Sequence, residues 1–159
     1  MAAPAFAVAL EASSLGVFMR ASVIAYPLAN LAHLLGLVLL VGPIIALDLR
    51  LLGFARALPV KALSSYLTPF AILGLLLMIA SGTLLFSADA AALSVNAVLQ
   101  IKVVLIALGL INAILFRLLW SGRLYDWDRR PAGFGRLQCA ASIGLWLGAG
   151  TAGRLIAYF

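Results

Sequence analysis

With 159 residues, of which 65% are hydrophobic and only 10% charged, the chain carries more apolar side chains than a small water-soluble domain can bury. Composition therefore excludes a soluble globular protein and predicts a lipid bilayer as part of the solvent. The net charge of +6 does not indicate nucleic-acid binding, because the basic residues lie in short stretches beside apolar runs, as they do in membrane proteins.

The first segment, Ala5–Arg20, is weakly amphipathic and too interrupted to cross a membrane. We expect it to form one short helix at the membrane interface. It lacks the basic start of a cleavable signal peptide, so we expect it to belong to the mature chain.

Four apolar segments follow, and each reaches the length of about 20 residues that a helix needs to cross the hydrocarbon core. Their approximate ranges are 23–47, 65–86, 97–119 and 137–158. There is no recognisable repeat and no sign of a second domain. The sequence therefore predicts an all-α fold, an integral membrane four-helix bundle in which residues 1–159 form a single transmembrane domain.

The basic residues predict how the spans are oriented. They concentrate in two connecting segments, with Arg50, Arg56 and Lys61 after the first span and Arg117, Arg123, Arg129, Arg130 and Arg136 between the third and fourth. Loops rich in Lys and Arg stay on the cytoplasmic side. We therefore expect a multi-pass protein of the bacterial inner (cytoplasmic) membrane with both termini outside, and with Trp120 and Trp127 in the cytoplasmic aromatic belt.

Ionisable residues within spans are costly and often functional. His33, the only histidine, shares a face of the first span with Leu40, Ile44 and Asp48, and Gly36 lies at the edge of that face. The small residue one turn away predicts space beside the imidazole, which favours a ligand site. The alternative is a histidine whose ring only bonds a neighbouring helix.

Lys102 lies near the outer end of the third span, on the same face as Gly109. A buried lysine that sheds its proton can act as a ligand or proton carrier. The alternative is that its methylene groups carry the ammonium out to the headgroups.

Three further polar residues have more ordinary structural explanations. Asp48 and Arg50 lie at the cytoplasmic end of the first span, where an acid is unfavourable and needs a cation. We expect a structural clamp between Asp48 and a basic loop residue, with a proton or ion site as the alternative. Asn112 fits an interhelical hydrogen bond.

The last span carries a ridge of small residues spaced four apart: Ala140, Gly144, Gly148 and Ala152. In lipid, such spacing lets two helix backbones approach closely. We expect the ridge to pack within the bundle, with a contact between chains as the alternative.

Nearly the whole chain resembles an uncharacterised family of small bacterial four-span membrane proteins. The resemblance rests on the run from His33 to Gly53, on Lys102 to Asn112, and on the closing Gly150 to Arg154. More distantly, the layout is similar to copper-resistance CopD-like proteins and HemJ-type membrane protoporphyrinogen oxidases.

In the HemJ-type proteins, a first-span histidine and a third-span lysine are implicated in binding haem b. The resemblance therefore implies that His33 and Lys102 are axial ligands of a haem iron, with Arg50 at the position of a cytoplasmic arginine. The acidic fourth-span motif of those oxidases is absent here, so the resemblance does not carry their enzymatic activity.

Together these observations predict a small membrane protein that binds haem b, with Gly36 and Gly109 making room for it, and serves electron transfer in the membrane. A quinone is the expected redox partner. The alternative is a cofactor-free accessory subunit of a larger respiratory or photosynthetic membrane complex, bound to other subunits or to a copy of itself. A copper path is not expected, because the chain has only three Met, one His and one Cys.

Overall fold

The structure is a computed structural model that describes residues 2–129, 132–156 and 158. All regular structure in these residues is helical, as the sequence predicts. The elements in chain order are α1 (Ala5–Ala12), α2 (Ser14–Ala21), α3 (Ala25–Leu52), α4 (Val60–Ala88), α5 (Ala90–Ser94), α6 (Ala97–Trp120), the 3₁₀ turn η1 (Ser121–Arg123) and α7 (Gly133–Leu155).

Three helical stretches are long and apolar enough to cross a membrane: α3, α4, and α6 continued through η1. The predicted span at 97–119 matches α6 closely. The other two helices extend beyond the predicted spans of 23–47 and 65–86. α3 continues to Leu52 because its stop is Gly53, whose φ of 111° is a left-handed conformation that suits glycine.

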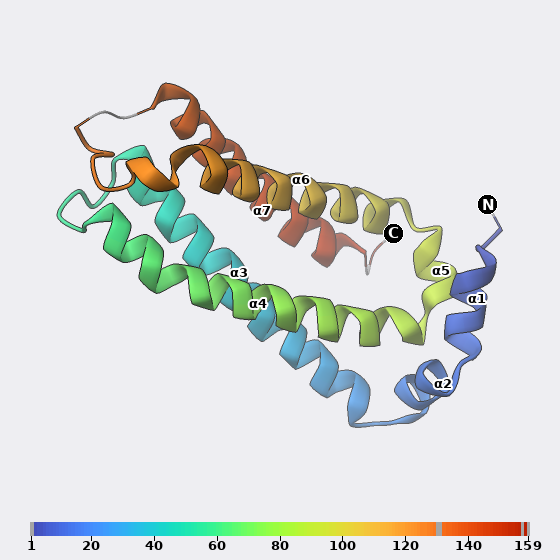
Figure 1. Cartoon of the computed structure of the whole chain (residues 1–159). Coiled ribbons are helices and arrows are strands. Elements are labelled where there is room, and N and C mark those ends of the chain that lie inside the picture. Colours follow the sequence, from blue (N-terminus) through green and yellow to red (C-terminus); the bar gives the residue numbers. More distant parts are fainter. Residues whose placement is uncertain (1, 130–131, 157, 159) are drawn as a thin grey trace.

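The long helices form two antiparallel pairs that are joined along one side. α3 runs beside α4 and α6 runs beside α7, and α7 also packs against α3 (Figure 1). α4 and α6 do not pack against each other. The bundle is therefore open along the α4–α6 side. α1, α2 and α5 lie at one end, toward which α7 also ends, and the two connecting loops lie at the other (Figure 1).

The end of the bundle that carries the two loops is filled by an aromatic core. Trp127, from the segment between η1 and α7, is 1% exposed and packs with Leu51, Val60 and Cys139. Its indole N–H donates to the carbonyl oxygen of Leu51 at 2.9 Å. The expectation that Trp127 belongs to an interfacial belt was therefore wrong, because its N–H finds a partner inside the protein.

The opposite end is closed by two short helices, where the sequence suggested one. The break falls at Ser13, whose hydroxyl accepts from the backbone N–H of Gly16 at 3.3 Å and caps α2. Gly16 is required here: a Cβ at this position would lie 2.7 Å from the carbonyl oxygen of Ser87. α2 therefore packs directly on the end of α4.

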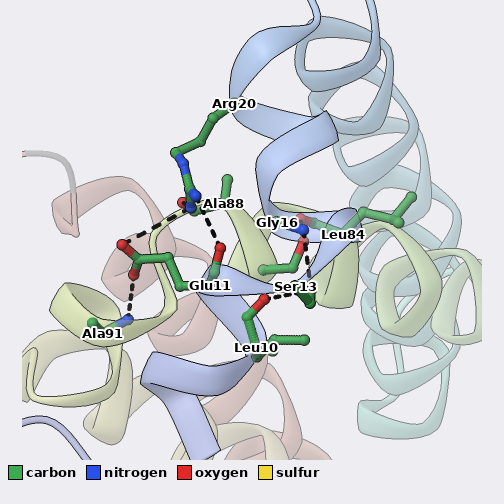
Figure 2. A network of polar contacts seen from close by, with 9 residues as sticks. Leu10, Glu11, Ser13, Gly16, Arg20, Leu84, Ala88 and Ala91 are labelled. Carbon is green, nitrogen blue, oxygen red and sulfur yellow. Dashed lines mark hydrogen bonds and ion pairs between the residues drawn. The ribbon is translucent and has the colours of Figure 1, made fainter.

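An ionic network ties these two helices to α4 and α5 (Figure 2). Arg20 donates to the carbonyl oxygens of Ala88 at 2.7 Å and of Glu11 at 2.9 Å. The Glu11 carboxylate accepts from the backbone N–H of Ala91 at 2.8 Å, in the first turn of α5. We call Glu11, Arg20 and their backbone partners the outer cap.

Candidate functional site

His33 lies on α3 and its ring is held by α4. Nδ1 is 2.9 Å from the hydroxyl oxygen of Ser81, and that hydroxyl donates to the carbonyl oxygen of Leu77 at 2.6 Å. Because the hydroxyl hydrogen is directed to Leu77, the Ser81 oxygen is free to accept a hydrogen bond from Nδ1–H. The imidazole is then the Nδ1–H tautomer, and its Nε2 carries the lone pair. Nε2 makes no hydrogen bond to any residue that the structure describes.

The space expected beside His33 at Gly36 is filled by protein. A Cβ at Gly36 would lie 3.1 Å from the carbonyl oxygen of Gly74, and a Cβ at Gly74 would lie 2.4 Å from the backbone nitrogen of Leu40. α3 and α4 therefore cross with their backbones almost in contact, and these two glycines make the crossing possible. Gly36 positions His33 against α4 and does not border a cavity.

Lys102 lies on α6 and packs against α7. A Cβ at Gly153 would lie 3.3 Å from the Lys102 ammonium nitrogen. The two predicted ligands thus lie on different helix pairs, His33 on the α3–α4 pair and Lys102 on the α6–α7 pair.

Gly109, the second glycine that we expected beside a cofactor, gives room to an indole ring. A Cβ at this buried position would lie 3.1 Å from the Trp146 ring on α7. The residue therefore serves the α6–α7 contact, and the space that the missing side chain leaves is occupied by Trp146.

Asp48 is buried, 8% exposed, and it faces α7. Its carboxylate lies beside the Ser142 hydroxyl and the Cys139 thiol, and its Oδ2 atom has no hydrogen-bond partner. No Lys or Arg within the described residues forms an ion pair with it. The expected clamp between Asp48 and a basic loop residue is therefore not what the structure shows.

The clamp is made instead by Arg50. Its buried guanidinium reaches Asp128, in the loop after η1, with N–O distances of 2.6 and 3.0 Å. It also donates to the carbonyl oxygens of Leu58 at 2.6 Å and Arg56 at 3.2 Å. The guanidinium hydrogen bond holds the pKa of the Asp128 carboxyl below its usual range. We call this group the inner anchor, because it joins the two loops.

Asn112 makes an interhelical hydrogen bond, as the sequence predicts. Its side-chain N–H donates to the backbone carbonyl oxygen of Gln138 at 3.0 Å. The Gln138 side-chain oxygen accepts from the indole N–H of Trp120 at 2.7 Å. These bonds join α6 to α7 just beyond Asp48.

The small-residue ridge does not form one contact surface. Ala152 is buried and Gly148 meets the Leu105 side chain of α6, whereas Ala140 and Gly144 are exposed. The face that α7 buries is a different one: Gly135, Gln138, Cys139, Ser142, Trp146, Ala149 and Ala152. The ridge crosses this face at an angle.

A cavity of about 410 Å³ lies between the four long helices on the Asp48 side of the bundle. It is lined mainly by apolar side chains, among them Leu40, Pro43 and Phe116, and also by Asp48, Ser142 and Trp146. It exists because α4 and α6 do not pack together. Arg117 of α6 reaches across to hydrogen-bond the Thr68 hydroxyl of α4 at its mouth. Sequence patterns carry no signal for such a space between helices.

No group of three or more His, Cys, Asp or Glu side chains that could hold a metal ion is present in the described part of the chain. A haem iron needs from the protein only axial ligands, which one or two side chains supply. Comparison with known proteins assigns the chain to no family: no family model matches it, and no curated protein and no solved structure matches it significantly.

Proposed function

We propose that α7 is a fourth membrane span beside the three helices that are apolar throughout. It has 23 residues, enough for the roughly 20 that a crossing requires. Its small and polar residues, such as Gln138 and Ser142, are buried against other helices, whereas Phe134, Leu137 and Leu147 are exposed. The lower hydropathy of α7 therefore comes from the small and polar residues that it buries, whereas the face that would contact lipid carries large apolar residues.

Four passes fit an orientation with both termini outside, in a bacterial inner membrane. The two basic loops share one end of the bundle, which the positive-inside rule assigns to the cytoplasm. The test uses the buried native Cys139 as a silent background. A membrane-impermeant maleimide should label Ala92→Cys in intact cells and Gly122→Cys only after the inner membrane is opened. The reverse pattern would reject the orientation.

Within this bundle, His33 is our candidate for an axial ligand of haem b in a protein that serves electron transfer. The observation that carries the proposal is the chain from His33 Nδ1 through the Ser81 hydroxyl to the Leu77 carbonyl oxygen. A histidine that ligates a metal almost always donates its other N–H to a protein group, which fixes the tautomer and aims the ring. The free Nε2 would supply a nitrogen donor to the haem iron.

Lys102 is the candidate for a second residue that would hold the haem iron. It lies on the other helix pair, with its ammonium nitrogen beside Gly153, and a neutral amine is a competent ligand. The haem would add a one-electron redox couple. The residues would hold it, with Ser81 orienting His33 and the apolar helix surfaces excluding water. Since Gly36 and Gly109 are packed against protein, the space for a porphyrin has to come from between the two helix pairs.

The test is an absorption spectrum of the purified chain, oxidised and dithionite-reduced, after expression with ample haem. We expect a Soret band and sharp α and β bands on reduction, lost in His33→Ala and altered in Lys102→Ala. Ser81→Ala should broaden or shift the bands, whereas Thr83→Ala should not. Thr83 is a matched control because it also bonds back to its own helix, at the Ile79 carbonyl oxygen, but is exposed.

A colourless wild type would reject the haem proposal. The chain would then be better explained as a cofactor-free accessory subunit of a larger membrane complex. Wild-type bands that survive in His33→Ala would reject this ligand assignment.

A further inference from the structure

The open side between α4 and α6 carries two cavities that meet at one polar contact. One is the cavity of about 410 Å³ on the Asp48 side of the bundle, and the other is a more open pocket beside it. Thr68, Ile72 and Arg117 line both of them. Because the Arg117 guanidinium of α6 donates to the Thr68 hydroxyl of α4, this hydrogen bond bridges the two helices where the cavities meet. We call the two cavities together the α4–α6 groove.

The Arg117 guanidinium is exposed and has unused donors. The Thr68 hydroxyl donates to the Ser64 carbonyl oxygen at 2.6 Å, so its oxygen is free to accept from Arg117. That bond uses one of the five N–H donors of a guanidinium. The other four donate to no residue that the structure describes, and no acid among these residues forms an ion pair with Arg117. Thr68 therefore holds a cation at the groove whose remaining donors are available to a ligand.

Beyond Arg117, away from the two connecting loops, the walls that α4 and α6 contribute to the groove are apolar. These two helices line it there with Ile72, Leu73, Leu76, Leu110, Ala113 and Ile114. The single polar residue that they add, Asn112, already donates to the Gln138 carbonyl oxygen at 3.0 Å. Along α4 and α6, the groove thus has a cation at its loop end and a hydrocarbon surface beyond it.

The end of the bundle that carries the two loops is basic. Arg50 pairs with Asp128, and Arg129 pairs with Asp126. Five other basic side chains at this end form no ion pair with any residue in the described ranges: Arg56, Lys61, Arg117, Arg123 and Arg136. Such an excess of positive charge attracts anionic groups and repels ammonium groups. The loop end of the groove therefore favours a ligand with a net negative charge.

A phospholipid of the adjacent leaflet has the same order of groups as the groove. Its phosphate lies at the membrane interface and its acyl chains run toward the middle of the bilayer. Basic pockets between transmembrane helices on the cytoplasmic side bind anionic headgroups in other membrane proteins. A free phosphate would leave the apolar length of the groove uncovered, and an uncharged lipid would leave Arg117 without a counterion. A zwitterionic headgroup would bring an ammonium group to a basic surface.

We infer that the α4–α6 groove is a binding site for an anionic phospholipid, with the phosphate on the Arg117 guanidinium and one acyl chain along the apolar walls. The inference rests on the proposed four-span bundle, which exposes the groove to lipid. It is separate from the haem proposal, because neither His33 nor Lys102 lines the groove.

The test is native mass spectrometry of the full chain in mild detergent, with phosphatidylglycerol or phosphatidylcholine of the same acyl chains added stepwise. The two lipids differ only in the headgroup. Wild type should bind one phosphatidylglycerol about five- to tenfold more tightly than phosphatidylcholine, which is the effect expected of one or two basic side chains near an anionic headgroup. Arg117→Gln should lose most of this preference. Arg123→Gln is the matched control and should keep it, because Arg123 is an exposed arginine at the same end that stacks over Trp120 and lines neither cavity.

A second pair of variants tests the acyl chain separately from the headgroup. Ala113→Phe places a ring in the groove, so it should weaken the binding of both lipids while the preference for phosphatidylglycerol remains. Ala107→Phe adds the same ring to an exposed position of α6 outside the groove, and it should change neither affinity. The melting temperature of each variant reports whether it is folded.

The inference is overturned if wild type binds the two lipids equally, or if Arg117→Gln keeps the wild-type preference. A dimer that forms without bound lipid and is lost in Ala113→Phe would also overturn it, because a second copy of the chain would then cover the groove. The mass of a bound haem is read separately in the same spectra. A wild type that lacks haem but prefers phosphatidylglycerol supports the lipid site and rejects only the haem proposal.

Discussion

The outer cap and inner anchor differ from the central cavity in how their charges are compensated. In the outer cap, Arg20 and Glu11 each find backbone partners, and in the inner anchor Arg50 satisfies Asp128 and two carbonyl oxygens. At the cavity wall, Asp48 and Trp146 keep unpartnered atoms. The charged groups of the cap and the anchor are therefore compensated within the protein, whereas Asp48 is buried without an ion-pair partner among the described residues.

The largest effect should come from breaking the inner anchor with Arg50→Ala. Removing one partner of a buried pair costs about 3–5 kcal/mol, and we expect the lower end because Asp128 is half exposed and can be rehydrated. The free energy of unfolding in mixed micelles measures this. Arg129→Ala is the control, because its pair with Asp126 is exposed and should contribute less than about 1 kcal/mol. Equal losses in the two variants would contradict the anchor.

A smaller loss should follow from Arg20→Ala in the outer cap. It removes two hydrogen bonds to carbonyl oxygens, and because Arg20 and Glu11 are partly exposed we expect a loss of about 1–2 kcal/mol. The expected signature is local: faster hydrogen exchange in α1 and α2 with little change in α6. Uniformly faster exchange through all helices would mean that the cap is not a separate unit.

Asp48→Asn should act in the opposite direction. Replacing a buried carboxyl group that has no ion-pair partner by an amide of the same shape should leave the free energy of unfolding unchanged or raise it by about 1 kcal/mol. The same unfolding assay measures it. A loss of more than about 1 kcal/mol would show that Asp48 is already satisfied, and the contrast between the two regions would fail.

The smallest expected effect is the loss of stability at low pH that comes from Asp128. Arg50 holds the pKa of Asp128 low in the folded chain, so this contribution to stability is complete above the unfolded pKa of about 4 and is lost as pH falls through the folded value. Asp128→Asn should be less stable than wild type at pH 7, with a gap that closes below about pH 4. A stability difference between wild type and Asp128→Asn that does not change with pH would show that it does not come from the charge of Asp128.

The sequence predicts the apolar helices well, because hydropathy and length suffice to locate α3, α4 and α6. It predicts an ionic clamp at Asp48, whereas the structure forms the clamp between Arg50 and Asp128. Asp48 and Arg50 are two positions apart on a helix and face different directions, so they cannot share a partner. The conformation of the loop that carries Asp128 decides which of the two side chains contacts it, and local sequence patterns do not encode that conformation.

The outer cap and the cavity are invisible to the sequence for a related reason. The break at Ser13 needs the Gly16–Ser87 approach, and the cavity needs α4 and α6 to stand apart. Both are tertiary arrangements. Gly36 and Gly109 were expected to leave room for a cofactor, but α4 and the Trp146 ring fill these places, and only the packing partner decides that.

The most direct test of the haem proposal, on which the proposed function depends, is native mass spectrometry of the gently extracted chain, wild type beside His33→Ala and Asp48→Asn. We predict one haem b per chain in wild type, lost in His33→Ala and kept in Asp48→Asn, because His33 belongs to the proposed ligand set and Asp48 does not. Wild type without haem, or haem kept in His33→Ala, would contradict the account.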